Sequence, residues 1–251
     1  MIRLILNDEH LTGVLDEAIR RCRHRLFLAT YAGVAVALAI PAIVRIGTRV
    51  GGPLLVLDSA GFLSIPLTVS FFAVTGLRAA FNLPAELRAN WIFQVCESEE
   101  RVTHIRAARK WIVVMGIVPL FALLAPFEIV FRGWALALIH LSFALLLSLL
   151  VLNLLLVWFR KIPFTCSYFP GKTSLAMMAF LYLAGFLTYT WTMGSLEARL
   201  IGAPLGLALF YALGGLALTG LEMLEKRELG VDDSLIYEDQ PDPIVRTLEL
   251  G

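Results

Sequence analysis

The chain has 251 residues, of which 59% are hydrophobic and only 16% charged, with a formal net charge of +1. A mean hydropathy of +0.79 excludes an ordinary soluble domain, in which about a quarter of the residues are charged. The near-neutral charge, without a basic run interleaved with aromatic residues, argues against nucleic-acid binding. We therefore expect an all-α, polytopic integral membrane protein whose main partner is the lipid bilayer.

Residues 1–25 are predicted to form an amphipathic helix on the inner leaflet, with a basic end near the lipid phosphates. The opening MIRLILNDEH is too short and too acidic for a cleaved secretory signal, so the first span is expected to act as the insertion signal. Asn7 suits a helix N-cap, and arginines crowd the last turn. A plain solvated helix is the alternative. One face of this helix carries Leu11, Val14, Leu15, Ala18, Ile19 and Cys22.

The region 26–222 is predicted to be a transmembrane domain of about six helices. Each apolar run in it is long enough to cross a hydrocarbon core of about 30 Å. The second run is the weakest, because Asp58 stands just before it. Four prolines lie five or more residues from both ends of a run, where neighbouring helices can satisfy the freed backbone groups. The runs are 26–46, 60–80, 111–131, 134–158, 173–194 and 200–222, and the prolines are Pro41, Pro66, Pro119 and Pro126.

The distribution of basic residues predicts that both termini are cytoplasmic. With the amino terminus inside, seventeen of the 21 Lys and Arg residues lie in cytoplasmic segments, as the positive-inside rule requires. The three cysteines, Cys22, Cys96 and Cys166, then also lie on the reducing side, as unpaired thiols should. This orientation suits the inner membrane of a bacterium.

The segment 82–110 is the longest internal connection and is predicted to be a helical cytoplasmic loop. Pro84 suits a first helical turn, and Leu87, Trp91 and Val95 follow at four-residue spacing. A second helix is expected to begin near Ser98 and to continue into the third span. The loop is therefore expected to be structured.

At this loop the chain resembles the permease subunits of ATP-binding-cassette exporters of the second type. Like those subunits, the chain is expected to have an amphipathic entry helix, six spans and a helical loop after the second span. In PAELRANWIF followed by RVTHIRAARK, Glu86, Arg88 and Trp91 match a branch of that family in type and spacing. The proline that the family has after the Trp is replaced by VCESEE. The resemblance implies a coupling helix that docks on a separate cytoplasmic ATPase subunit. The alternative is an interfacial helix embedded in lipid headgroups.

Ionisable residues inside spans are functional candidates, because they are costly to place there. His140 and Asn153 form a candidate intramembrane polar site, in which His140 acts as a helix-packing hydrogen-bonding residue or, alternatively, as a proton relay. Glu128 and Arg132 are four residues apart, so we expect them to form a structural ion pair. Glu222 lies at the inner end of the sixth span.

No catalytic, metal or cofactor-binding residues are expected. The four histidines are dispersed, and no paired aspartates, Ser with His, or H-E-x-x-H motif is present. Gly171, Lys172 and Thr173 imitate the end of a phosphate-binding loop, but Cys166 stands where its first glycine would be. We therefore expect a protein that is not an enzyme. An intramembrane enzyme relying on His140 is a minor hypothesis.

Two further features bear on assembly. The first span carries Ala29, Gly33 and Ala37 at four-residue spacing, and the last carries Gly202 with Gly206 and Ala208 with Ala212, small-residue faces that permit close helix approach. Residues 223–251 form an acidic, proline-bearing cytoplasmic tail that is expected to be poorly ordered.

The leading hypothesis is the permease component of an ATP-driven exporter, energised by an ATPase subunit that docks on residues 84–110. The permease would work as a homodimer or with a partner permease. The scarcity of polar groups in the spans favours a lipid-like or amphipathic substrate over an ion. The alternative is a non-transporting membrane scaffold or assembly factor that recruits partners through the loop and the tail.

Overall fold

The computed structural model describes residues 22–48, 60–81, 101–157 and 175–231, and these residues are helical apart from short turns. No strand occurs in these ranges. The elements are α2 (Cys22–Thr48), α3 (Ala60–Ala80), α5 (Arg101–Ile112), the π-helix η3 (Val113–Ile117), α6 (Val118–Arg132), α7 (Trp134–Val157), α8 (Leu175–Leu200) and α9 (Pro204–Val231).

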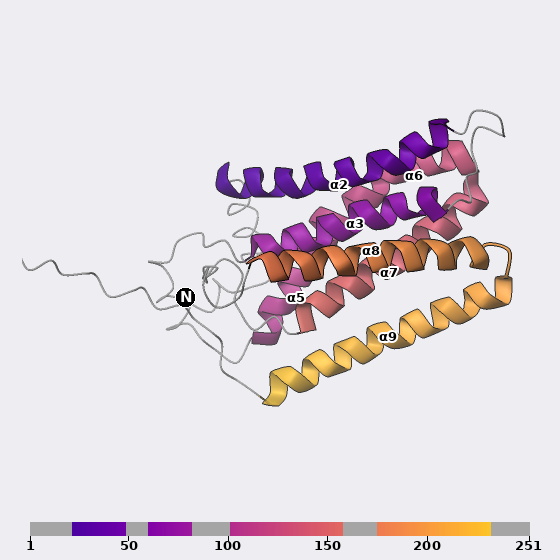
Figure 1. Ribbon diagram of the computed structural model, residues 1–251. Coiled ribbons are helices and arrows are strands. Elements are labelled where there is room, and N and C mark those ends of the chain that lie inside the picture. The colour runs from indigo at the N-terminus through magenta and orange to yellow at the C-terminus, as the bar shows by residue number, and fades with distance from the viewer. Residues whose placement is uncertain (1–21, 49–59, 82–100, 158–174, 232–251) are drawn as a thin grey trace, which may run out of the picture.

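The helices lie side by side in one bundle and alternate in direction along the chain (Figure 1). Because α5, η3 and α6 follow one another without a break and count as one segment, the described residues form six long helical segments. The α6–α7 turn at Gly133 and the α8–α9 turn lie at one end, which we call the Gly133 end (Figure 1). The start of α5 and the last residues of α9 lie at the other, the Arg109 end (Figure 1).

The long apolar helices make the fold compatible with a multi-pass integral membrane protein. Within the described ranges, four helical stretches are long and apolar enough to cross a membrane: Phe62–Ala80, Arg106–Arg132, Trp134–Val157 and Pro204–Glu225. In α2 the side chains that the structure describes include the apolar stretch Arg25–Ile40. All six predicted apolar runs fall on described helices to within a few residues, so the helical fold class is confirmed. The number of six spans and the cytoplasmic termini stay predictions.

The outer surface of the bundle is apolar and its interior is partly polar. Large hydrophobic side chains are widely exposed, with Leu205 at 88%, Val130 at 79% and Trp191 at 74%. Buried positions include Ser70, Thr75 and several charged residues. In a membrane, contact with lipid costs an apolar side chain nothing, whereas polar groups need protein partners. This distribution therefore matches a lipid-embedded protein.

The second helix predicted within the 82–110 loop continues into the third span over the described residues from Arg101 onward, and a π-helical turn marks the junction. In η3 the chain makes a wider turn, in which the Val118 N–H donates to the Val113 carbonyl. Pro119 follows directly, and proline lacks an N–H and clashes with the carbonyl four residues earlier. A π turn relieves that clash, and such turns are frequent at functional sites. The α5 side packs against α3 and α7 through Phe81, Trp111 and Leu156.

Most of the small residues predicted to form contact faces on the first and last spans do not pack on another described helix, the exception being Gly206, where an added Cβ would lie 2.8 Å from Cδ2 of Leu200 on α8. Helix α2 packs on α3 through a different face that includes Ala35 and Ala39. A Cβ added at Gly33 would meet nothing within 4 Å. On α9, Ala208 and Ala212 are exposed. Residues 1–21, which include most of the predicted amphipathic helix, lie outside the described residues.

The close approach between α2 and α3 depends on Gly76. A Cβ at this position would lie 2.9 Å from Cγ and 3.0 Å from Cβ of Tyr31, and the Tyr31 Cβ cannot move without its backbone. We expect Gly76→Ala to lower the free energy of unfolding by about 1–3 kcal/mol, the usual effect of overpacking. Gly33→Ala is the matched control and should change it by less than about 0.5 kcal/mol. Equilibrium unfolding in mixed detergent micelles measures both, and equal effects would contradict this packing.

Candidate functional site

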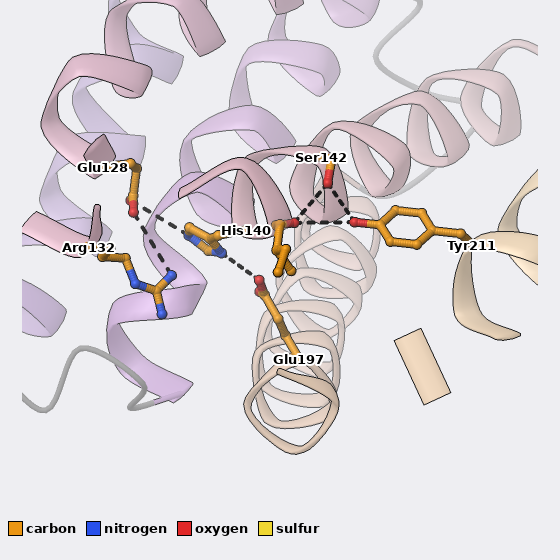
Figure 2. Close-up of polar contacts among 7 residues, drawn as sticks. Glu128, Arg132, His140, Ser142, Glu197 and Tyr211 are labelled. Carbon is orange, nitrogen blue, oxygen red and sulfur yellow. Dashed lines mark hydrogen bonds and ion pairs between the residues drawn. The ribbon is translucent and has the colours of Figure 1, made fainter. Parts of the chain in front are cut away.

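Four charged or ionisable side chains gather inside the bundle near the Gly133 end. They are Glu128 and Arg132 from α6, His140 from α7 and Glu197 from α8, and we call them the His140 cluster (Figure 2). All four residues are buried, with between 0% and 8% of their surface exposed. Three helices therefore contribute charge to one site inside an apolar bundle.

His140 lies at the centre of the cluster, between two carboxylates (Figure 2). Its Nδ1 is 2.6 Å from Oε1 of Glu197, a short hydrogen bond between two fully buried side chains. Its Nε2 is 3.6 Å from Oε1 of Glu128, within ion-pair distance. The imidazole thus bridges α6 and α8, although it belongs to α7.

Arg132 completes the cluster at its α6 side. Its Nη1 lies 4.0 Å from Oε2 of Glu128, so the two residues form the pair predicted from their four-residue spacing. Its guanidinium carbon also lies 5.6 Å from the ring centroid of Phe62 on α3. An arginine over an aromatic face gains electrostatic attraction, more when water is excluded. Both side chains of this pair are buried in the bundle.

Several polar atoms of the cluster are buried and have no hydrogen-bond partner among the protein groups. They are Oε2 of Glu128, Nε2 of His140 and Oε2 of Glu197. The hydroxyl of Tyr189, on α8 two helical turns before Glu197, is also buried without a hydrogen-bond partner. An unpaired buried polar group costs about 1–3 kcal/mol. A protein that keeps several at one place inside a membrane bundle has a site worth a functional hypothesis.

Two tight turns place the cluster. Helix α6 ends at Gly133, whose φ of +75° favours glycine and whose N–H donates to the Ile129 carbonyl at 2.9 Å. Since α7 starts at the next residue, the last turn of α6 lies beside the first turns of α7. The α8–α9 turn closes with the Ala203 N–H donating to the Leu200 carbonyl at 2.9 Å, and Pro204 opens α9.

A second polar contact links α7 to α9 next to the cluster. The hydroxyls of Ser142 and Tyr211 are 2.6 Å apart, and their oxygens lie 2.9 and 3.3 Å from the Ile139 carbonyl oxygen (Figure 2). One hydroxyl donates to the other, and that second hydroxyl donates to the carbonyl. Ser142 therefore takes part in a hydrogen bond between helices. Two other polar residues of this helix bond inside α7, Ser148 to the Ala144 carbonyl and Asn153 to the Leu149 carbonyl.

The structure places His140 and Asn153, the two residues of the candidate intramembrane polar site, apart from each other. Both lie on α7, thirteen residues apart, so about 20 Å of helix separates them. Asn153 is buried, and its Oδ1 has no hydrogen-bond partner. His140 instead combines with groups from two other helices.

The other predicted site residues, Glu86, Arg88 and Trp91, lie outside the described residues. The loop to which they belong re-enters the described range at Arg101. Its last part, α5, is fixed to α9 by an ion pair between Arg109 and Glu225, whose side chains are 20% and 8% exposed. The end of the loop is therefore tied to the last helix at the Arg109 end.

Sequence reasoning missed Glu197 because the fifth span was taken to end at residue 194. That boundary is wrong, since α8 continues to Leu200 and carries Glu197 into the bundle. The signals were present: Gly202 and Pro204 punctuate the chain only after Leu200, and Leu196, Ala198 and Leu200 favour continued helix. A later helix end places the glutamate opposite His140.

The cluster can hold charge and protons, and it joins three helices. It contains no Ser, Thr, Cys or Lys side chain, and in the part of the chain that the structure describes, no group of three or more His, Cys, Asp or Glu side chains is arranged to hold a metal ion. No family model, no curated protein and no solved structure matches this chain.

Proposed function

We propose that this chain is the membrane-embedded permease component of an ATP-driven exporter in a bacterial inner membrane. In this proposal it crosses the membrane six times, keeps both termini in the cytoplasm and is energised by a separate nucleotide-binding subunit. That subunit docks on residues 84–110, with Glu86, Arg88 and Trp91 at the contact. A homodimer or a partner permease completes the transport path.

The observation that carries the proposal is the continuous helix from the end of this loop to the buried cluster. Helices α5, η3 and α6 run without a break from Arg101 to Arg132. One end is bound to α9 through Arg109 and Glu225, and the other end carries Glu128 and Arg132. A displacement of the loop therefore acts directly on the opposite end of the bundle. A coupling element of a transporter requires such a connection.

The buried charges favour a transporter over the alternative, a non-transporting scaffold. A scaffold recruits partners through its surface and needs no charged groups inside the bundle, where they are costly. Here Glu128, Arg132, His140 and Glu197 are all buried. Salt-bridge networks that have two discrete arrangements can carry coupling between distant sites, and charged groups inside a membrane bundle are functional candidates by default.

Site-specific crosslinking tests the docking. In a chain whose three cysteines are replaced by serine, Trp91→Cys should crosslink in cells to a protein that mass spectrometry identifies as a nucleotide-binding subunit. The physical reason is that the proposed coupling face presents residue 91 to the ATPase. The readout is the adduct on a denaturing gel.

Trp134→Cys in the same background is the matched control. Trp134 is 69% exposed and begins α7 at the Gly133 end, opposite to the loop. No ATPase adduct is expected from it. Adducts from both positions would mean nonspecific capture, and none from either, with the protein correctly inserted, would refute docking on this loop.

A further inference from the structure

The two ring nitrogens of His140 face one carboxylate each. Nδ1 is 2.6 Å from Glu197 and Nε2 is 3.6 Å from Glu128. A neutral imidazole carries one N–H and one lone pair, so it can donate to only one of two ionised carboxylates. The other ring nitrogen would then direct its lone pair at a negatively charged oxygen. While both carboxylates are ionised, only the imidazolium, with two N–H donors, can donate to both at once, whereas a neutral imidazole fits these positions when one carboxyl carries the proton instead.

The charge balance of the cluster leads to the same result. Two carboxylates, Glu128 and Glu197, face a single permanent cation, Arg132. With a neutral His140 and two ionised carboxylates the cluster would keep one uncompensated negative charge in a site from which water is largely excluded, which is strongly unfavourable, so the cluster favours one additional proton. One proton on His140 makes the four groups neutral in sum. In the described residues around the site, α3 contributes the uncharged Phe62, and α8 also carries Tyr189 with its hydroxyl unpaired.

We propose that the His140 cluster is a proton-binding site, in which His140 holds one proton as an imidazolium between Glu128 and Glu197. The proton joins α6, α7 and α8 at the Gly133 end. Its release to water leaves two carboxylates against one arginine, so the contact between α8 and the α6–α7 pair loses its attraction. Because α8 packs mainly against α3, it can separate from α7 without losing its largest interface. The inference does not depend on the proposed permease function.

The protonation state of His140 can be observed directly. The chain has four histidines, so replacing His10, His24 and His104 by glutamine leaves His140 as the only one. We expect the side-chain ¹⁵N spectrum of this variant in lipid vesicles to show two protonated ring nitrogens at about pH 8, where an exposed histidine is neutral. A spectrum of a neutral imidazole at that pH would overturn the proposal.

A linkage measurement tests the same site without spectroscopy. Above about pH 7 an unfolded chain leaves its histidines mostly neutral, so a folded chain that holds the extra proton loses stability as the pH rises. One proton changes the folding equilibrium constant tenfold per pH unit. Glu197→Gln removes one negative charge, so Glu128 and Arg132 balance without a proton on His140. The ratio of the wild-type to the variant equilibrium constant should therefore fall about a hundredfold between pH 7 and pH 9.

Glu222→Gln is the matched control, since Glu222 is an exposed glutamate of α9. It should follow the wild-type pH dependence. If Glu197→Gln also follows the wild-type dependence over this range, His140 holds no additional proton and the proposal fails. If Glu197→Gln does not fold, Glu128→Gln provides the same test from the other side of the imidazole.

Discussion

Replacing His140 by leucine is expected to lower the free energy of unfolding by about 3–5 kcal/mol, the usual effect of removing one member of a buried ion pair. The leucine fits the apolar surroundings of α7, but it leaves Glu197 buried without its 2.6 Å partner and Glu128 with Arg132 alone. Equilibrium unfolding in mixed micelles, followed by circular dichroism, measures the change.

A second substitution distinguishes a lost ion pair from poor packing. In His140→Leu/Glu197→Leu both partners become apolar, and such replacements are often neutral or stabilising. The double variant should therefore be more stable than His140→Leu alone. Asn153→Leu is the matched control on the same helix, since Asn153 is buried and bonds only inside α7, and it should not destabilise. If the double variant has a lower free energy of unfolding than His140→Leu, the electrostatic explanation is contradicted.

Arg109→Ala is expected to lower the free energy of unfolding by about 2–4 kcal/mol, somewhat less than at a fully buried pair because a fifth of the Arg109 side chain is exposed. The substitution leaves Glu225 buried at 6% exposure without its counter-charge. It also releases α5 from α9. The same unfolding assay measures the loss, and proteolysis between residues 100 and 112 measures how far α5 detaches.

Charge reversal supplies the internal control for this pair. Arg109→Glu alone should be more damaging than Arg109→Ala, because it places two carboxylates together. Adding Glu225→Arg should restore most of the stability. Glu222→Ala, one turn earlier on the exposed face of α9, should change stability by less than about 0.5 kcal/mol. If the Arg109→Glu/Glu225→Arg double variant does not recover stability, the ion pair contributes little to holding α5 against α9.

The helices could be predicted because, in a chain surrounded by lipid, the hydrophobicity and length of a segment are nearly sufficient to identify a helix. The run 60–80 coincides with α3, and 134–158 exceeds α7 by one residue. Ends were less certain, since a helix does not stop where hydropathy falls. Helix α9 was expected to end near residue 222, yet it continues to Val231. The charged residues 225–227 do not break a helix, because Glu, Lys and Arg are good helix formers.

The candidate site was half predictable. The pairing of Glu128 with Arg132 follows from helical spacing alone, which is local information. The approach of Glu197 to His140 joins residues 57 positions apart, and it depends on how far α8 extends and which face it turns inward. Small-residue spacing was similarly ambiguous: on α2 it marks a possible contact face, but Tyr31 and Gly76 determine which face packs on α3.

The single-residue turn at Gly133 has a consequence for biosynthesis. Helices α6 and α7 form a hairpin that carries its own counter-charges, since Glu128 lies beside Arg132 and faces His140. Glu197 is translated 57 residues after His140, so the cluster stays incomplete while the hairpin already exists. Docking of α8 then completes the cluster, which makes the contact between His140 and Glu197 a late step of assembly. A chain in which α8 has not yet docked therefore differs from the folded protein in lacking this contact.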